Sequence, residues 1–252
     1  MDVEIILPIV LLAFSCELVD STIGMGYGTT LTPILLALGY EPIEIVPAVL
    51  FSEFVTGVLA GFFHHEFGNV NLHPGSRDFK IAAVLTSLST LGVILAVVLS
   101  FKLPAWVIKL YIGFLVLSLG LLILKRNKQK IPFSWKRIGG LGFLAASNKG
   151  ISGGGYGPVV TSGQVLSGVR GRNAVGIASL AEGITSIVGV VVFLLSGTPI
   201  PWQLAPSLLL GAIVSVPISA YAVSRIPVGR LTLLIGGIST TLGSYTLLRL
   251  LF

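Results

Sequence analysis

Six apolar stretches, each about 20 residues long, limit the fold of this chain more than any other feature. An α-helix rises 1.5 Å per residue, so each stretch can cross the ~30 Å of hydrocarbon in a bilayer. Only 10% of the 252 residues are charged, against about 25% in a soluble domain. The sequence therefore predicts an all-α polytopic membrane protein. The predicted spans are 43–63, 80–100, 104–124, 174–195, 203–222 and 228–250.

Two pairs of shorter apolar segments precede the long spans and are interrupted by polar residues and glycines. Residues 3–19 and 23–39 form the first pair, and residues 138–150 and 152–168 form the second. As a helix, 138–150 reaches only about 20 Å, which is too short to cross a bilayer comfortably. We expect each pair to be a Gly-broken short helix pair, either a re-entrant hairpin or two short crossings.

A shift of 129 positions aligns the two pairs without a gap. "GMGYGTTLTP" begins at Gly24, and "GGGYGPVVTS" begins at Gly153. The chain therefore reads as two repeats, residues 1–125 and 138–252, joined by a basic linker at 126–137. The matched pairs are Gly24 with Gly153, Gly26 with Gly155, Tyr27 with Tyr156, Gly28 with Gly157, Thr32 with Thr161, Gly39 with Gly168, Glu53 with Glu182, and Thr56 with Thr185.

Basic residues indicate how the repeats lie in the membrane. Each repeat makes an odd number of crossings, so the two repeats have opposite orientations. With the linker 126–137 in the cytoplasm, most of the 16 Lys and Arg residues fall on the cytoplasmic side, as the positive-inside rule requires. Only Lys102, Lys109 and Arg249 fall outside, and Lys149 lies within the membrane. The N-terminus is then outside.

The glycine phrases predict the substrate site. Glycine weakens a helix by about 1 kcal/mol relative to alanine, and a broken helix is tolerated in lipid only where protein buries it or it lines a wet cavity. The helix that restarts after a break offers free N–H groups and a positive dipole end to an anion. The alternative is that the glycines only allow close helix packing. The candidate substrate-binding residues are Gly24, Gly26, Tyr27, Gly28, Thr29, Thr32, Lys149, Gly153, Gly155, Tyr156, Gly157 and Thr161.

Ionisable residues inside apolar segments cost about 2.5–3.5 kcal/mol on insertion scales and mark functional sites. Asp20 and Lys149 are 129 residues apart. They either form a salt bridge that closes the site, or Lys149 binds the anion while Asp20 is displaced or protonated. Burial disfavours an ionised carboxyl group, so Asp20, Glu53 and Glu182 are candidates for proton coupling or gating. Alternatively, the two glutamates are neutral and hydrogen-bond to neighbouring helices. Glu17 either joins this cluster or lies nearer the interface.

Other kinds of site find little support. The single Cys16 excludes an intrachain disulfide. "HHE" at residues 64–66, with His73, resembles a metal cluster, but we assign it to a solvated cytoplasmic loop and expect neither a metal site nor a cofactor. No basic face is large enough for nucleic acid. An intramembrane enzyme would need Ser15 or Cys16 beside Asp20, without a histidine.

The two glycine phrases, each followed by a membrane glutamate, resemble the TauE/SafE sulfite-exporter family. The family pattern falls on Gly24, Gly26, Gly28 and Pro33 in the first half. In the second half it falls on Gly153, Gly155 and Gly157, with Ser162 in place of the proline. The resemblance implies a multi-pass plasma-membrane transporter for sulfite, sulfonates such as sulfoacetate, thiosulfate or other small anions.

We therefore expect a secondary transporter that carries a small sulfur-containing oxyanion by alternating access, with proton coupling as one option. The alternatives are a cation transporter that uses the in-membrane carboxylates, an intramembrane enzyme, and a non-transporting scaffold. The expected partners are the anionic substrate and the lipid bilayer, and a homodimer is compatible with this architecture.

Overall fold

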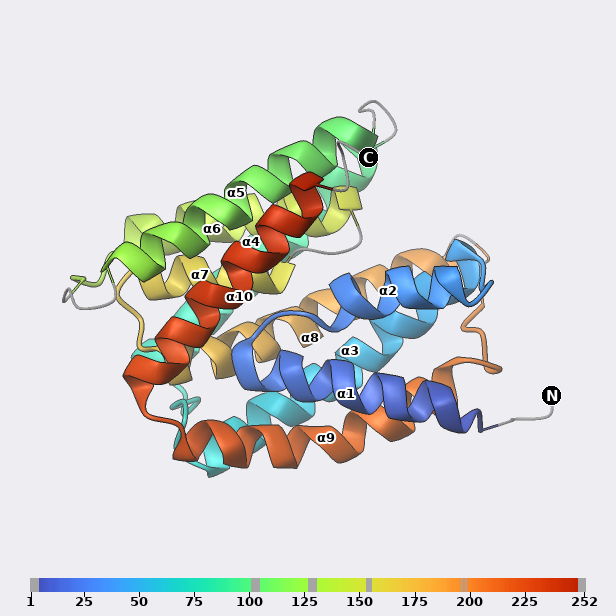
Figure 1. The fold of residues 1–252 in the computed structure, drawn as a ribbon, viewed down its shortest axis with the longest axis horizontal. Coiled ribbons are helices and arrows are strands. Elements are labelled where there is room, and N and C mark those ends of the chain that lie inside the picture. Colours follow the sequence, from blue (N-terminus) through green and yellow to red (C-terminus); the bar gives the residue numbers. More distant parts are fainter. Residues whose placement is uncertain are drawn as a thin grey trace.

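The computed structural model describes residues 5–100, 105–126, 131–152, 156–195, 197 and 199–248. All regular secondary structure in these ranges is helical, in ten helices (Figure 1). The helices are α1 (Leu7–Ile23), α2 (Tyr27–Ala37), α3 (Pro42–Glu66), α4 (Arg77–Ser100), α5 (Ala105–Arg126), α6 (Trp135–Ser152), α7 (Tyr156–Leu166), α8 (Gly171–Leu195), α9 (Ala205–Arg225) and α10 (Val228–Leu248).

The predicted long spans correspond to α3, α4, α5, α8, α9 and α10. Among the described residues, α3 from Ile43 onward, α8, α9 and α10 are long and apolar enough to cross a membrane. The predicted fold class, an all-α polytopic membrane protein, is confirmed. One length was wrong: α6 begins at Trp135 and has 18 residues, so it spans about 27 Å instead of the ~20 Å expected for residues 138–150.

Each short pair forms a hairpin of one longer and one shorter helix. Helix α1 has 17 residues and α2 has 11, and α2 runs back toward the end of the molecule at which α1 begins (Figure 1). The chain reverses at Gly24 and Gly26, whose φ angles are 78° and 134°. Only glycine adopts such angles without strain. The first glycine phrase is therefore a true interruption between two helices.

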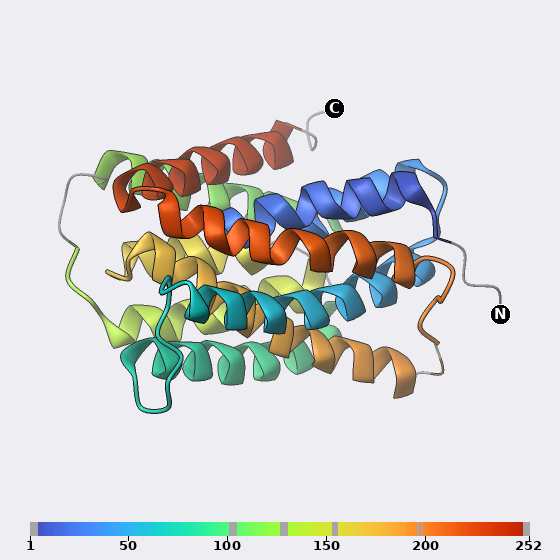
Figure 2. The same ribbon diagram turned by 90° about the horizontal axis from the view of Figure 1, so that it is seen from below.

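In the second hairpin, α6–α7, the residue before the first helix is hydrogen-bonded to the residue after the second helix. The backbone N–H of Ser134, just before α6, donates to the carbonyl oxygen of Ser167, just after α7, at 3.1 Å. Figure 2 shows that the open end of the α6–α7 hairpin lies opposite to the N-terminus. The open end of the α1–α2 hairpin lies at the same end of the molecule as the N-terminus. The two hairpins thus enter from opposite ends, and residues 153–155 at the second turn lie outside the described residues.

Four of the helix pairings can be compared between the two halves of the chain. Helix α1 packs against α9, and α6 packs against α4, while α3 packs against α8 and α5 against α10. If each helix is exchanged for its counterpart in the other half, the first two pairs interchange and the last two map onto themselves. This is the pattern that a two-fold relation between the halves requires. The orientation of the halves in a bilayer stays a prediction.

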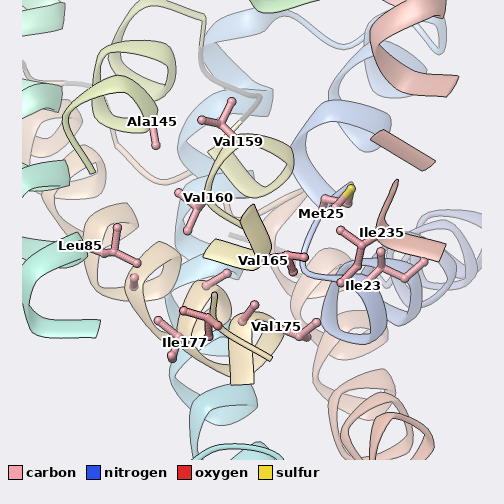
Figure 3. Packing of buried hydrophobic residues seen from close by; sticks show 14 of the residues in the cluster. Ile23, Met25, Leu85, Ala145, Val159, Val160, Val165, Val175, Ile177 and Ile235 are labelled. Carbon is pink, nitrogen blue, oxygen red and sulfur yellow. The ribbon is translucent and has the colours of Figure 1, made fainter. Parts of the chain in front are cut away.

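Two clusters of buried apolar side chains hold the helices together. The smaller one joins α1, α2, α3 and α9. The larger one draws mainly on α4, α6, α7, α8 and α10, but it also takes in Ile23 and Met25 at the turn of the first hairpin. Figure 3 shows Ile23 and Met25 in the same cluster as Val159 of α7 and Ile235 of α10. The tip of the first hairpin is therefore packed into the second half of the chain.

Candidate functional site

The turn of the first hairpin contacts helix α7 of the second hairpin. The hydroxyl group of Thr161, in α7, donates to the carbonyl oxygen of Gly24 at 2.7 Å. A Cβ atom on Gly157 would lie 2.7 Å from that oxygen and 2.8 Å from the Cα of Met25. Only a residue without a side chain allows this approach. The two glycine phrases, 129 residues apart in the sequence, are thus direct neighbours.

A carboxylate already caps the first helix that restarts after a break. The backbone N–H of Tyr27, at the start of α2, donates to Oδ1 of Asp20 at 3.2 Å. An acidic side chain at this position satisfies an orphan N–H and complements the helix dipole. Asp20 therefore occupies the N-terminal end of α2, which the sequence assigned to a substrate anion.

Four carboxyl groups converge beside this cap and line one small cavity, here called the carboxyl cavity. Its volume is about 10 Å³, close to what one water molecule needs. Buried hydroxyl-bearing residues and a glycine complete the wall. The lining residues are Glu17 and Asp20 from α1, Glu53, Thr56 and Gly57 from α3, and Ser179 and Glu182 from α8.

A close crossing of α3 and α8 brings together Glu53 and Glu182, the two glutamates that match under the 129-residue shift. A Cβ atom on Gly57 would lie 2.6 Å from the Cα of Gly183 and 2.6 Å from the carbonyl oxygen of Ser179. Small residues at such a crossing let two helix backbones approach closely in a membrane. Because Glu53 and Glu182 lie within one turn of these glycines, the crossing sets their side chains around the same cavity.

Glu17 is the most deeply buried of the four carboxyl groups, with 2% of its surface exposed. The hydroxyl of Ser21 donates to its Oε1 at 2.6 Å. Thr56 Oγ1 lies 3.4 Å from Glu17 Oε2 and 2.9 Å from the carbonyl oxygen of Ser52. Thr56 has a single hydroxyl hydrogen for two acceptors. Thr56 can therefore donate to only one of them at a time, and the contact to Ser52 is the shorter.

Glu53 also lies beside a hydroxyl group that has two possible acceptors. Ser186 Oγ lies 3.1 Å from Glu53 Oε2 and 2.9 Å from the carbonyl oxygen of Glu182. A Cβ atom on Gly28 would lie 2.8 Å from Glu53 Oε1. Gly28 lies inside helix α2 and not in the break, and its missing side chain makes room for the carboxyl group. Gly157 is likewise inside α7, where it makes room for the first hairpin tip.

The matched tyrosines are buried and hydrogen-bonded away from the cavity lining. Tyr27 Oη is 2.8 Å from Ser52 Oγ, and Tyr156 Oη is 2.9 Å from Ser89 Oγ. Neither ring lines the carboxyl cavity. Thr32 is half-buried in α2. The side chains of Thr29 and Lys149, and the residues Gly153 and Gly155, lie outside the described residues.

A family model described as "Sulfite exporter TauE/SafE" matches residues 9–246. The chain belongs to the TauE/SafE family. The "Probable membrane transporter protein YtnM" of Bacillus subtilis (strain 168) is 31% identical over 245 residues, which cover 92% of this chain and 79% of that protein. No solved structure matches this chain. The predicted family is confirmed, and the chain is a multi-pass membrane transporter of that family.

One sequence assignment was wrong in this TauE/SafE protein. His64 and His65 do not belong to a solvated loop, because they form part of the last turn of α3, and His64 is fully buried. His64 Nε2 donates to the carbonyl oxygen of Ser21 at 3.0 Å, and Asn69 Nδ2 donates to His64 Nδ1 at 3.0 Å. A carbonyl only accepts and an amide nitrogen only donates, so His64 is the neutral tautomer with its proton on Nε2.

Sequence reasoning about this TauE/SafE chain left Glu17 undecided and did not single out Ser179, Gly57 or Gly183. Glu17 carried a usable signal, because residues three apart on a helix share a face and Asp20 was already a candidate. The two glycines carried none, since they do not match each other under the 129-residue shift. Their pairing depends on how α3 crosses α8.

Proposed function

We propose that this TauE/SafE protein is a secondary transporter that moves a small anion together with protons held in the carboxyl cavity. The anion is sulfite, a sulfonate such as sulfoacetate, or another sulfur-containing oxyanion. The description of the family as sulfite exporters supports the substrate class. The observation that carries the mechanism is the carboxylate of Asp20 on the N–H of Tyr27, at the meeting point of two opposed hairpins.

Asp20 makes the anion site conditional on a proton. An oxyanion at the N-terminus of α2 and an ionised Asp20 would compete for the same N–H groups and repel each other. Protonation of Asp20 removes the negative charge and weakens its hold on Tyr27. The N-terminus of α2 is then open to the substrate. Lys149, the predicted cation of α6, would bind the substrate or pair with Asp20 when the site is empty.

The hydroxyl groups of the site support protons on Glu17 and Glu53. Thr56 and Ser186 can each give their hydrogen to a carbonyl oxygen one turn back, which is the shorter contact at 2.9 Å in both cases. Their oxygen atoms can then accept a hydrogen bond from a protonated carboxyl group, 3.4 Å away at Glu17 and 3.1 Å away at Glu53. An ionised carboxylate would face the lone pairs of the same hydroxyl.

This linkage between protonation and anion binding predicts symport. Because protonation favours anion binding, the anion and the proton cross together, and the prevailing gradients decide between export and uptake. Alternating access would come from movement of one inverted repeat against the other, with the hairpin tips as the shared gate. The α3–α8 crossing beside the carboxyl cavity is the contact that such a movement must shift.

Flux into proteoliposomes tests the proposal. Sulfite or sulfoacetate uptake should rise when the pH is lowered on the side that holds the anion. The neutral variants Asp20→Asn and Glu53→Gln should lose this pH response, while Glu66→Gln, an exposed residue at the end of α3, should keep it. Full pH-driven transport by both neutral variants would refute the proton role. Absence of flux for any sulfur-containing anion would refute the substrate class.

A cation transporter is the second candidate, favoured by the four carboxyl groups around one cavity. Within the described ranges, no group of three or more His, Cys, Asp or Glu is arranged to hold a metal ion. The cavity would therefore suit a monovalent ion better than a multivalent one. Binding competition separates the two candidates: mutual exclusion of sulfite and Na⁺ favours the cation carrier, whereas sulfite binding that strengthens at low pH favours the anion carrier.

A further inference from the structure

A second, much larger cavity lies outside the carboxyl cavity, at the end of the molecule predicted to be cytoplasmic. Its volume is about 440 Å³, and it lies between the loop 67–76, the start of α8 and the start of α10. Figure 2 shows this loop at the end opposite to the N-terminus. We call it the basic vestibule. Its polar lining includes His65, Asn69, His73, Arg170, Arg172 and Asn173.

Arg170 is a cation of the vestibule that is open to a ligand. Its guanidinium group is exposed and makes no hydrogen bond or ion pair with any residue that the structure describes. Three other arginines at this end are engaged. Arg137 donates to two carbonyl oxygens, and the guanidinium groups of Arg77 and Arg225 lie 5.1 Å from the ring centres of Phe133 and Tyr221.

Arg172 is held in place without using all its donors. Its Nε and Nη2 atoms donate to the carbonyl oxygen of Ile226 at 3.1 and 2.6 Å. A guanidinium group has five N–H bonds, so three remain for a ligand. This anchoring orients the planar group before a ligand arrives, which suits recognition of an oxyanion.

The carboxylate that contacts the vestibule wall is separated from the cavity itself. Asp78 is buried and does not line the cavity. Its Oδ2 accepts from the backbone N–H of Asn71 at 3.0 Å and from the side-chain amide of Asn173 at 2.5 Å. The helices α8 and α10 also begin here, at Gly171 and Val228, and their positive dipole ends add to the charge of the arginines.

A short chain of hydrogen bonds joins the vestibule to the carboxyl cavity. Asn69 lines the vestibule and donates to His64, and His64 donates to the carbonyl oxygen of Ser21. The hydroxyl of Ser21 in turn donates to Glu17. The wall of the vestibule and the wall of the carboxyl cavity are therefore parts of one bonded unit.

We infer that the basic vestibule is an oxyanion-binding site, at which a sulfite- or sulfate-like anion is held by Arg170 and Arg172 before it enters the transport path. Its role as an entry site rests on the proposed function, whereas the binding of an oxyanion does not. The cavity is wide enough for an anion with part of its hydration shell, which suits a capture site of modest affinity.

Calorimetric titration of sulfate and sulfite into the detergent-solubilised protein tests the binding directly. Arg170→Gln should weaken binding about tenfold, because one charge-assisted contact is lost, and Arg170→Glu should abolish it. The matched control is Arg230→Gln, which removes an exposed arginine of α10 that does not line the vestibule and should leave the affinity unchanged. Equal effects of Arg170→Gln and Arg230→Gln would overturn the inference.

Flux measurements separate an entry site from a lipid contact. In phosphatidylcholine vesicles, Arg170→Gln should raise the KM for the anion on the vestibule side and leave kcat unchanged. If the variant differs from the wild type only when phosphatidylglycerol is present, Arg170 binds a lipid headgroup and the inference is wrong. If the wild type transports no sulfur-containing anion but binds sulfate through Arg170, the proposed function fails and the vestibule stands.

Discussion

The hydroxyl of Thr161 in α7 donates a hydrogen bond of 2.7 Å to the carbonyl oxygen of Gly24 at the turn of the first hairpin, and this bond joins two hairpins that enter from opposite ends of the molecule. Gly24 has a φ angle of 78° and follows the last residue of α1. Its carbonyl is not used within a helix, so Thr161 satisfies a buried backbone acceptor. The bond is a direct link between the two halves.

Loss of this bond should destabilise the folded protein. Thr161→Val keeps the shape of the side chain but leaves the oxygen of Gly24 without its donor, which costs about 1–3 kcal/mol. Thr161→Ser keeps the hydroxyl and should lie near the wild type. Thermal unfolding in detergent measures both. Equal unfolding midpoints for Thr161→Val and the wild type would show that the bond contributes nothing.

The crossing of α3 and α8 should not tolerate a methyl group. In Gly57→Ala, the new Cβ would lie 2.6 Å from the backbone of Gly183, so the two helices must separate and the carboxyl cavity must change shape. We expect a lower unfolding temperature and loss of transport. The control is Gly237→Ala in α10, where no atom lies within 4 Å of the new Cβ.

The higher helix propensity of alanine gives this control an expected effect of opposite sign. Gly237→Ala should stabilise α10 by up to about 1 kcal/mol, because alanine has the higher helix propensity. The two variants make the same chemical change with opposite expected signs. A stabilising effect of Gly57→Ala would mean that the helices do not approach as closely as described.

Asp20 should have separable structural and electrostatic roles. Asp20→Ala removes the side-chain cap on Tyr27 and should cost about 0.5–2 kcal/mol of stability. Asp20→Asn keeps an oxygen acceptor for the same N–H, so it should fold almost as stably as the wild type. Its flux should nevertheless lose the dependence on pH. If both variants unfold at the same temperature, the cap is not an energetic feature of the hairpin.

The isosteric substitution Glu17→Gln tests whether Glu17 is protonated. A protonated Glu17 donates to Thr56 and accepts from Ser21, and the amide of Glu17→Gln can reproduce both bonds. We therefore expect Glu17→Gln to keep the unfolding temperature of the wild type at neutral pH. Glu17→Leu, which removes both bonds, should lower it. A drop in Glu17→Gln as large as that in Glu17→Leu would show that the site requires a negative charge.

His64 should matter for stability, whereas the exposed His73 should not. His64→Ala removes the donor to Ser21 and the acceptor for Asn69, both buried, and should cost about 1–3 kcal/mol for each group left unpaired. His73 is exposed, so His73→Ala serves as the control. Calorimetric or thermal unfolding in detergent distinguishes the two. Similar small effects of both substitutions would show that the hydrogen bonds of His64 to Ser21 and Asn69 do not contribute to stability.

The sequence alone determined the features that depend on local pattern. The long apolar stretches predicted α3, α4, α5, α8, α9 and α10, because a helix must match the thickness of the bilayer. The glycine phrase at Gly24 predicted the break after α1, because glycine weakens helices and permits positive φ. The 129-residue shift placed Glu53 and Glu182 at equivalent positions, and the motifs identified the family.

Only the tertiary structure decided which side chains meet. Nothing local shows that Asp20 caps α2, that Glu17 joins the cavity, that Gly57 faces Gly183, or that His64 is buried against Ser21. These relations depend on how the helices rotate and cross. Hydropathy does not predict this, because the faces of a membrane helix that contact lipid are as apolar as those that contact other helices. Hydropathy therefore locates a helix in the chain, whereas the few small and polar residues on it select its partner.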